Sequence, residues 1–217
     1  MATRFVKIVF IAICCIFFSR AYSYATGIGV FGSFGYGETE AELEGSNTFG
    51  ENFIKNYDLD NTRYIFGFVM DTAVAENTLF NYRLQLGYGR GTIDFNYRRE
   101  DTDTHSVTRN QYSYSIWDIS LVHSFGFGIV RTQYVRLWLG PQIGLNYSDD
   151  LNGSQYGEFG IKFGLVAGIN VNIGNFISLF VDGGIRYQIS FAKEPWFHNG
   201  YEGFVDTGIM FRIGDRY

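Results

Sequence analysis

The residues best suited to chemistry in this sequence are three histidines, two of which are followed directly by serine. They are His105 beside Ser106, His123 beside Ser124, and His198. A serine nucleophile needs a histidine within hydrogen-bond reach and a third group that orients this histidine. Neighbouring residues of a strand point to opposite faces, so His123 and Ser124 cannot serve each other in an extended segment. The other pair lies in a charged segment without an evident oxyanion site, and we therefore predict no catalytic residue.

A second candidate is a polar segment in which carboxylates far outnumber basic side chains. It holds Glu38, Glu40, Glu42, Glu44, Glu51, Asp58 and Asp60 against Lys55. Two interpretations fit such a segment. It is either a site for divalent cations or a basic partner, or a solvated loop. The run from Asp149 to Gly153 offers oxygen ligands of the kind that calcium accepts, but Asp, Asn and Gly are also common turn residues. Because the run lacks the spacing of a calcium loop, we expect no metal site and no cofactor.

The elements that must position these groups are strands, and residues 159–173 show their pattern most clearly. Every second residue from Phe159 to Ile173 is apolar, and the alternate positions hold mainly glycine and polar residues. A period of two belongs to an extended strand, whose side chains alternate between two faces. The eight segments with this pattern lie within residues 28–36, 63–71, 80–89, 112–125, 135–147, 159–173, 177–189 and 201–213. In the fourth segment, Tyr112, Tyr114 and Ile116 have the opposite parity to Trp117, which predicts a bulge near Ile116.

The segments between the predicted strands alternate in length. Long polar segments, 38–61, 93–111, 148–158 and 190–200, follow strands one, three, five and seven. The connections after strands two, four and six are shorter, and the last is Gly174-Asn175, a favourable pair for a two-residue hairpin. All long loops therefore leave at one end, which is the layout of an up-and-down barrel.

The N-terminal segment has the features of a secretory signal. Arg4 and Lys7 precede an apolar run over residues 8–18, and Ser23-Tyr24-Ala25 supplies small residues for cleavage, with Ala21 as the alternative site. The apolar run is too short to span a bilayer, which takes about 20 helical residues. We predict a cleaved signal peptide at residues 1–25 and a single barrel domain at residues 26–217.

Removal of this segment changes the charge and cysteine content of the chain. Cys14 and Cys15 both lie in the segment, so the mature chain has no cysteine, which is compatible with export to an oxidising compartment. The loss of Arg4, Lys7 and Arg20 leaves 14 basic residues against 22 acidic ones. A balance this acidic argues against nucleic acid as a partner.

Two kinds of eight-stranded barrel fit this pattern, and they differ in what the apolar face meets. A soluble lipocalin-like barrel turns its apolar face inward, whereas a membrane barrel turns it toward lipid. The apolar faces hold about forty bulky groups, which would not fit inside an eight-stranded barrel that a few layers of side chains already fill. We therefore predict an all-β fold, an eight-stranded antiparallel up-and-down transmembrane β-barrel. The lipid-facing residues are predicted to include Phe66, Phe68, Leu84, Leu86, Leu139, Leu165, Val181 and Ile209.

The opposite face is rich in glycine and polar residues, and we place it in the lumen. Its charges have both signs, and because an isolated buried charge is costly, each cation should have a carboxylate partner. The predicted lumenal charge network comprises Arg83, Asp118, Arg136, Lys162, Asp182, Arg186, Glu202, Asp206 and Arg212. Tyrosines near the strand ends predict an aromatic girdle at the membrane boundary. The predicted girdle residues are Tyr36, Tyr64, Tyr88, Tyr147, Tyr187 and Tyr201.

With its signal segment, its eight alternating strands and its ending of Ile209, Phe211, Ile213 and Tyr217, the chain resembles the small eight-stranded outer-membrane barrels of Gram-negative bacteria, the OmpA/OmpX-like family. Asp215 departs from the alternation at that end. The resemblance implies a place in the outer membrane, with loops outside and termini in the periplasm. It also implies contact with outer-membrane lipid and lipopolysaccharide, and recognition of the last strand, ending in Tyr217, by the barrel-assembly machinery.

The predicted function is structural or interactive. Four long outer loops would carry the contacts of the protein with a surface ligand, and the polar lumen would be largely plugged by its own side chains. Two alternatives remain open at this point. One is a small channel or uptake barrel for ions or small solutes, and the other is a barrel enzyme that modifies lipid A with histidine and serine.

Overall fold

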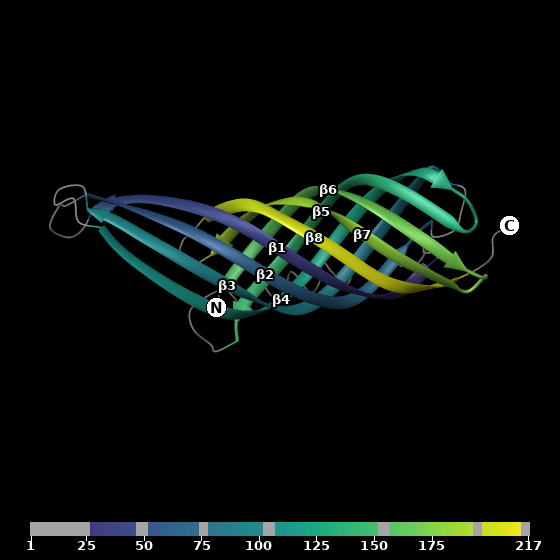
Figure 1. The fold of residues 1–217 in the computed structure, drawn as a ribbon, viewed down its shortest axis with the longest axis horizontal. Helices are drawn as coiled ribbons and strands as arrows, with labels where there is room; N and C mark the ends of the chain where they lie inside the picture. The colour runs from purple at the N-terminus through teal and green to yellow at the C-terminus, as the bar shows by residue number, and fades with distance from the viewer. Residues whose placement is uncertain are drawn as a thin grey trace.

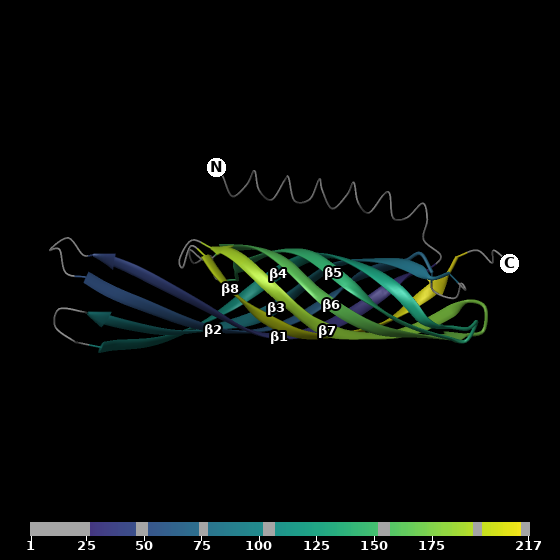
Figure 2. The same ribbon diagram turned by 90° about the horizontal axis from the view of Figure 1, so that it is seen from above.

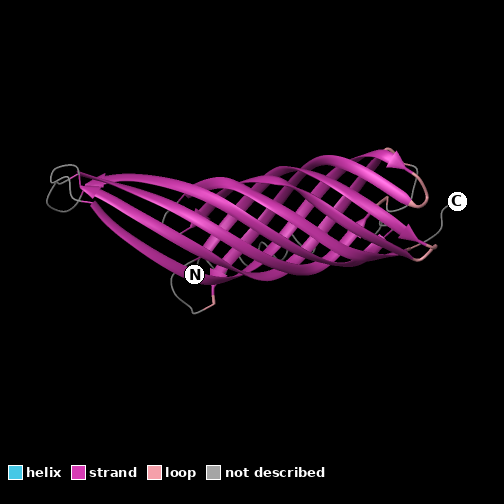
Figure 3. Ribbon diagram, viewed as in Figure 1, coloured by secondary structure: helices cyan, strands magenta, loops and turns pink. Residues whose placement is uncertain are grey.

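The computed structural model describes residues 27–46, 52–73, 78–101, 107–151, 157–192 and 197–213. Strands make up nearly all of this part of the chain (Figure 3). They are β1 (Gly27–Ser46), β2 (Asn52–Asp71), β3 (Phe80–Asp101), β4 (Val107–Arg131), β5 (Val135–Asp150), β6 (Gly157–Ile173), β7 (Ile177–Ala192) and β8 (Phe197–Arg212). In this part of the chain no helix is long and apolar enough to cross a membrane. The predicted signal peptide lies outside the described residues.

The eight strands form one closed barrel. Each strand pairs antiparallel with the next, and β8 pairs with β1, so that Gly27 lies opposite Arg212. A path through directly paired residues leads from Gly27 around all eight strands and returns to β1 at Gly37, ten residues further along. This stagger tilts the strands by roughly 40° to the barrel axis, as closure of an eight-stranded sheet requires. The predicted fold, an eight-stranded antiparallel up-and-down barrel, is confirmed.

Four of the strands are much longer than the other four. β1 to β4 have 20, 20, 22 and 25 residues, whereas β5 to β8 have 16 or 17. The surplus of β1 to β4 projects beyond the rim of the barrel at one end (Figures 1 and 2). We call these ends of β1 to β4, residues 38–46, 52–61, 92–101 and 107–116, the extension, and the opposite end of the barrel the turn end. At the base of the extension, residues 38–40 still pair with β8, and Ile116 still pairs with Asp150 of β5.

The connections at the end that carries the extension are short, so the prediction of four long outer loops is wrong. The strand ends leave only residues 47–51, 102–106, 151–156 and 193–196 as connections at that end. Most of the segments 38–61 and 93–111 are paired strand, because their polar residues continue the antiparallel ladder past the rim. At the turn end, Ile173 pairs with Ile177, so the hairpin has three residues instead of the predicted two. Gly174 supplies the left-handed conformation there, with a φ of 61°.

The predicted bulge near Ile116 is wrong. β3 and β4 pair without a shift from Phe80 opposite Phe127 to Glu100 opposite Val107, and the irregularity of β4 lies further on, between Gly128 and Val130. The parity changes because Ile116 faces the inside of the barrel. In the extension, four apolar residues form a buried cluster on this inner side. They are Leu59, Ile93, Phe95 and Ile116.

Candidate functional site

The outer face of the barrel is apolar. Phe66 and Leu165 have 72% and 69% of their surface exposed, and Phe68, Leu139 and Val181 are exposed beside them. All eight predicted lipid-facing residues lie on this face by strand parity. A face this rich in uncovered large apolar groups is unfavourable in water. A soluble barrel with its apolar face inside does not fit this arrangement.

Some residues of the outer face are buried in the structure. Leu84 is only 1% exposed and packs with Met70 and Leu121, and Leu86 is partly buried against the same cluster. Their register nevertheless places these residues on the outer side, because each alternates with a buried polar neighbour such as Arg83 or Gln85. Strand parity, rather than exposure, therefore decides the face on which they lie.

Near the middle of the lumen, two cations share two carboxylates. Lys162 Nζ lies 2.5 Å from Glu202 Oε2, and Arg186 Nη1 lies 3.4 Å from Glu202 Oε1. Arg186 Nη2 also lies 3.7 Å from Asp206 Oδ2, and Gln85 Nε2 donates to the same oxygen at 3.0 Å. All five side chains are buried. The carboxylate partner expected for Lys162 is thus Glu202, from β8.

Toward the turn end, a second group surrounds Arg83. Its guanidinium forms ion pairs with Asp71, at 2.7 Å, and with Asp182. It also donates to Asn170 Oδ1 at 2.7 Å. The same guanidinium lies 4.4 Å from the ring centroid of Phe180, a geometry that adds a cation–π attraction. Arginine suits this position because its several donors can serve carboxylates and an amide together.

At the rim end of the lumen, Arg63 and Glu158 anchor a third group. Arg63 Nη1 lies 3.1 Å from Asp118 Oδ2, and its Nη2 lies 3.5 Å from Glu158 Oε1. That carboxylate also accepts a hydrogen bond from Ser190 Oγ at 2.7 Å, and its Oε2 lies 3.5 Å from His198 Nε2. His198 was predicted in a loop, but it lies on β8, directly opposite Ser190 of β7. The loop was overestimated because β7 and β8 continue to Ala192 and from Phe197.

The structure thus places seven of the nine predicted network residues in buried ion pairs. For Arg136 and Arg212 it gives hydrogen bonds to the carbonyl oxygens of Thr78 and Gly174, each at 3.0 Å, near the turn end. Arg63, Asp71 and Glu158 also form buried ion pairs, although they were not among the predicted network residues. Arg63 and Asp71 share the parity of the polar face, which is the signal that could have included them.

Large apolar side chains also lie inside the barrel, among these charged groups. Phe31, Ile65, Val69, Phe180 and Met210 form one buried cluster inside the barrel, and Trp138, Val166 and Phe204 form another. Gly168 makes room for the Trp138 ring, because an added Cβ would lie 2.6 Å from it.

Among the described residues, neither His123 with Ser124 nor His198 with Ser190 forms a nucleophilic pair. His123 lies on the outer side, with its Nδ1 2.6 Å from Tyr82 Oη, while Ser124 faces inward and accepts from Gln142 Nε2 at 2.8 Å. Ser190 donates to Glu158 and not to His198. His105 and Ser106 lie outside the described residues. Within the part of the chain that the structure describes, no group of acidic, histidine or cysteine side chains is arranged to hold a metal ion.

The predicted girdle tyrosines all lie on the outer face near the rim. Tyr36, Tyr64, Tyr88 and Tyr201 are exposed, and Tyr187 is partly exposed. Tyr147 is buried, with its ring 5.5 Å from that of Trp117.

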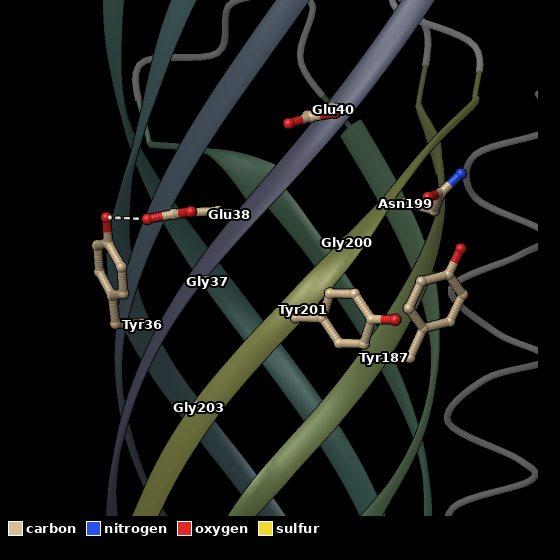
Figure 4. Close-up of a pocket in the computed structure, with 9 residues that line it drawn as sticks. All are labelled: Tyr36, Gly37, Glu38, Glu40, Tyr187, Asn199, Gly200, Tyr201 and Gly203. Atoms are coloured by element: carbon tan, nitrogen blue, oxygen red, sulfur yellow. Dashed lines mark hydrogen bonds between the residues drawn. The ribbon is translucent and has the colours of Figure 1, made fainter.

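A groove crosses the outer face between β1 and β8, where the extension begins (Figure 4). It encloses about 390 Å³ and is lined by Tyr36, Gly37, Glu38, Glu40, Tyr187, Asn199, Gly200, Tyr201 and Gly203. The rings of Tyr187 and Tyr201 stand edge to face on one side of it, with centroids 5.2 Å apart. Tyr36 stands on the other side and donates to Glu38 Oε1 at 3.2 Å.

Among the comparisons with known proteins, only the one with solved structures found similarities. The sequence matches no protein-family model and no curated protein. Among solved structures, the chain is similar to Neisserial surface protein A, at 14% identity and a TM-score of 0.41, over 85% of this chain and 97% of that one. It is similar to the outer membrane protease OmpT from Escherichia coli, at 7% identity and a TM-score of 0.40, over 86% and 97% of the two chains. It is also similar to the translocator domain of the autotransporter NalP from Neisseria meningitidis, at 12% identity and a TM-score of 0.27, over 98% and 100%. These similarities assign no activity to the chain.

Proposed function

We propose that this protein is an integral outer-membrane barrel with a closed lumen, and that its extension serves as a contact surface outside the cell. The observation that carries the proposal is the opposite polarity of the two faces of the barrel. Large apolar side chains cover the outside, while Lys162, Arg83 and Arg63 are buried inside with carboxylate partners. Only a surrounding hydrocarbon phase makes such an arrangement favourable, and closure of the strand ladder leaves no backbone edge unpaired in that phase.

The proposed orientation places the extension outside and the turn end in the periplasm. Short periplasmic turns and longer outer segments are the usual arrangement of such barrels. The outward side of the extension carries Glu38, Glu40, Asp58 and Asp60 and suits an aqueous setting. In this proposal the signal over residues 1–25 is removed, the outer face meets lipid and lipopolysaccharide, and the segment ending in Tyr217 engages the barrel-assembly machinery.

The membrane assignment can be tested with the mature chain, residues 26–217, refolded in detergent. We expect it to need detergent to stay monodisperse and to migrate differently on gels before and after boiling, because the closed barrel resists unfolding by the gel detergent. Mature protein that is freely soluble and monodisperse without detergent would contradict the assignment.

A small channel is the second candidate, and the polar wall of the lumen favours it. The buried ion pairs that bridge the lumen argue for a closed barrel, so we expect no steady conductance when the refolded protein is added to planar bilayers. A reproducible open state would favour the channel instead. A role in lipid A modification would show as a change in intact lipid A profiles between cells with and without the protein. We expect those profiles to be the same.

A further inference from the structure

The groove between β1 and β8 is shaped by a missing side chain on the outer face. Gly203 lies between Tyr201 and Val205 in the outward row of β8, and both of these neighbours are exposed. A Cβ added to Gly203 would find only the carbonyl oxygen of Tyr36 within 4 Å, at 3.9 Å. The space above Gly203 is therefore open and is bounded on its two sides by tyrosine rings.

The rim end of the groove is strongly acidic. Glu38 and Glu40 line it, and none of the nine lining residues is basic. Glu38 lies directly opposite Asp60 of β2, and Asp60 lies directly opposite Asp94 of β3. Like charges in directly opposed positions of a sheet repel each other.

The other end of the groove opens onto the apolar outer face. Ile185 of β7 lies directly opposite Gly203, and Val205 of β8 and Phe34 of β1 lie beyond it. All three are exposed. A ligand that fills the groove would thus meet carboxylates and ring faces at one end and the hydrocarbon-facing surface at the other. Aromatic faces and carboxylates both attract organic cations. A divalent metal ion would gain nothing from the tyrosine rings.

We infer that this groove binds the ammonium head group of a membrane amphiphile. The cationic head lies between Glu38, Glu40 and the rings of Tyr36, Tyr187 and Tyr201, and the apolar chain leaves over Gly203 along the outer face. The inference rests on the proposed membrane placement, because the chain of the ligand must continue into lipid. It adds a ligand class and a binding site to the structural role proposed above.

The test uses the mature chain refolded in micelles of an uncharged detergent, with hexyltrimethylammonium as the probe. We expect saturable changes in the backbone amide NMR signals of Gly37, Gly200 and Gly203. Hexyl sulfate should give no saturable change, and tetramethylammonium, which lacks the chain, should bind at least about tenfold more weakly. Equal responses to hexyl sulfate, or equal affinities for the two ammonium ions, would overturn the inference.

Two glycine variants separate binding in the groove from partitioning of the probe into the micelle. Gly203→Leu fills the groove without a backbone clash and should abolish the saturable response. Gly183→Leu is the matched control, since Gly183 also lies on the outer face and an added Cβ would have its nearest neighbour at 3.4 Å. It should leave the response unchanged. Unchanged binding in Gly203→Leu would overturn the inference.

The charge of the site is tested by the double variant Glu38→Gln, Glu40→Gln. We expect its affinity for hexyltrimethylammonium to fall about tenfold, because the ion loses both carboxylates of the groove. An unchanged affinity would contradict the assignment of the head group. Failure of this inference is distinguishable from failure of the proposed function. A barrel that needs detergent but does not bind the probe refutes only the inference, whereas a soluble barrel refutes the membrane placement itself.

Discussion

Strands β1 to β4 run through both the closed barrel, which we call the barrel section, and the extension. The inner and outer faces of these strands have opposite polarity in the two regions. On β2, Phe66 and Phe68 point outward in the barrel section while Arg63 is buried inside. Further along the same strand, Asp58 is exposed on the outer side and Leu59 is buried on the inner side. The reversal takes place within one continuous ladder, without a change of register between β1, β2, β3 and β4.

This difference shows that the surroundings, and not the strand, decide which face is apolar. In hydrocarbon an outward apolar side chain costs nothing and the polar groups must pair inside. In water the same outward position favours a charged residue, and the apolar groups gather on the sheltered side. The change from Phe66 to Asp58 therefore marks the approximate level at which β2 leaves the proposed membrane.

The largest effect is expected inside the barrel section. Glu202→Gln leaves Lys162 and Arg186 charged and buried without their shared carboxylate, so the free energy of unfolding should fall by about 3 to 5 kcal/mol. The measurement is urea unfolding in lipid vesicles. The matched control is Glu38→Gln on the exposed outer face, which should change stability by less than about 0.5 kcal/mol. Similar losses of unfolding free energy in the two variants would contradict the proposed difference between the inner and outer faces.

The next effect concerns the outer faces of the two regions. Leu165→Arg, on the lipid-facing side of β6, should cost about 2 to 4 kcal/mol in the same assay, because the charge must enter hydrocarbon. Asp58→Arg, on the outer side of the extension, should cost less than about 0.5 kcal/mol because the side chain stays in water. Equal tolerance at positions 165 and 58 would count against the membrane boundary.

The smallest expected effect on stability compares the buried cluster of the extension with the outer face of the barrel section. Ile93→Val removes one methyl group from the buried cluster of the extension and should lower the opening free energy there by about 0.5 to 1.5 kcal/mol. Ile185→Val removes the same group from the exposed outer face of β7. It should cost less, because lipid chains fill the space. Amide hydrogen exchange measures both, and a larger loss for Ile185→Val would reverse the comparison.

The strands of the barrel section could be predicted well because their alternation is nearly complete. Residues 159–173 read as a strand from sequence, and β6 spans Gly157–Ile173. Prediction failed where the polarity reversed. Tyr114 and Ile116 suggested a bulge because a single apolar face was expected along the whole strand. The polar segment 38–61 was predicted as a loop because charged residues recur there and no continuous apolar face marks a strand.

The candidate site was predictable by residue type and face but not by partner. The parity of Lys162 placed it with the polar residues, and the cost of an isolated charge predicted a carboxylate near it. Its partner Glu202 is 40 residues away on β8, and the stagger of the closed barrel decides that these two side chains meet. The groove above Gly203 gave no signal in the sequence, because its tyrosines and glutamates come from three strands.

The sequence by itself determined the number of strands, the two-faced character of each, and the residues that belong to the polar side. Those properties depend on the local period of two, which any extended segment has. The tertiary structure decided the pairing of the buried charges, the closure of the strand ladder, the projection of β1 to β4 and the groove at their base. Each of these depends on how far one strand is shifted against the next, and a shift of two residues changes every cross-strand neighbour without altering the alternation of any strand.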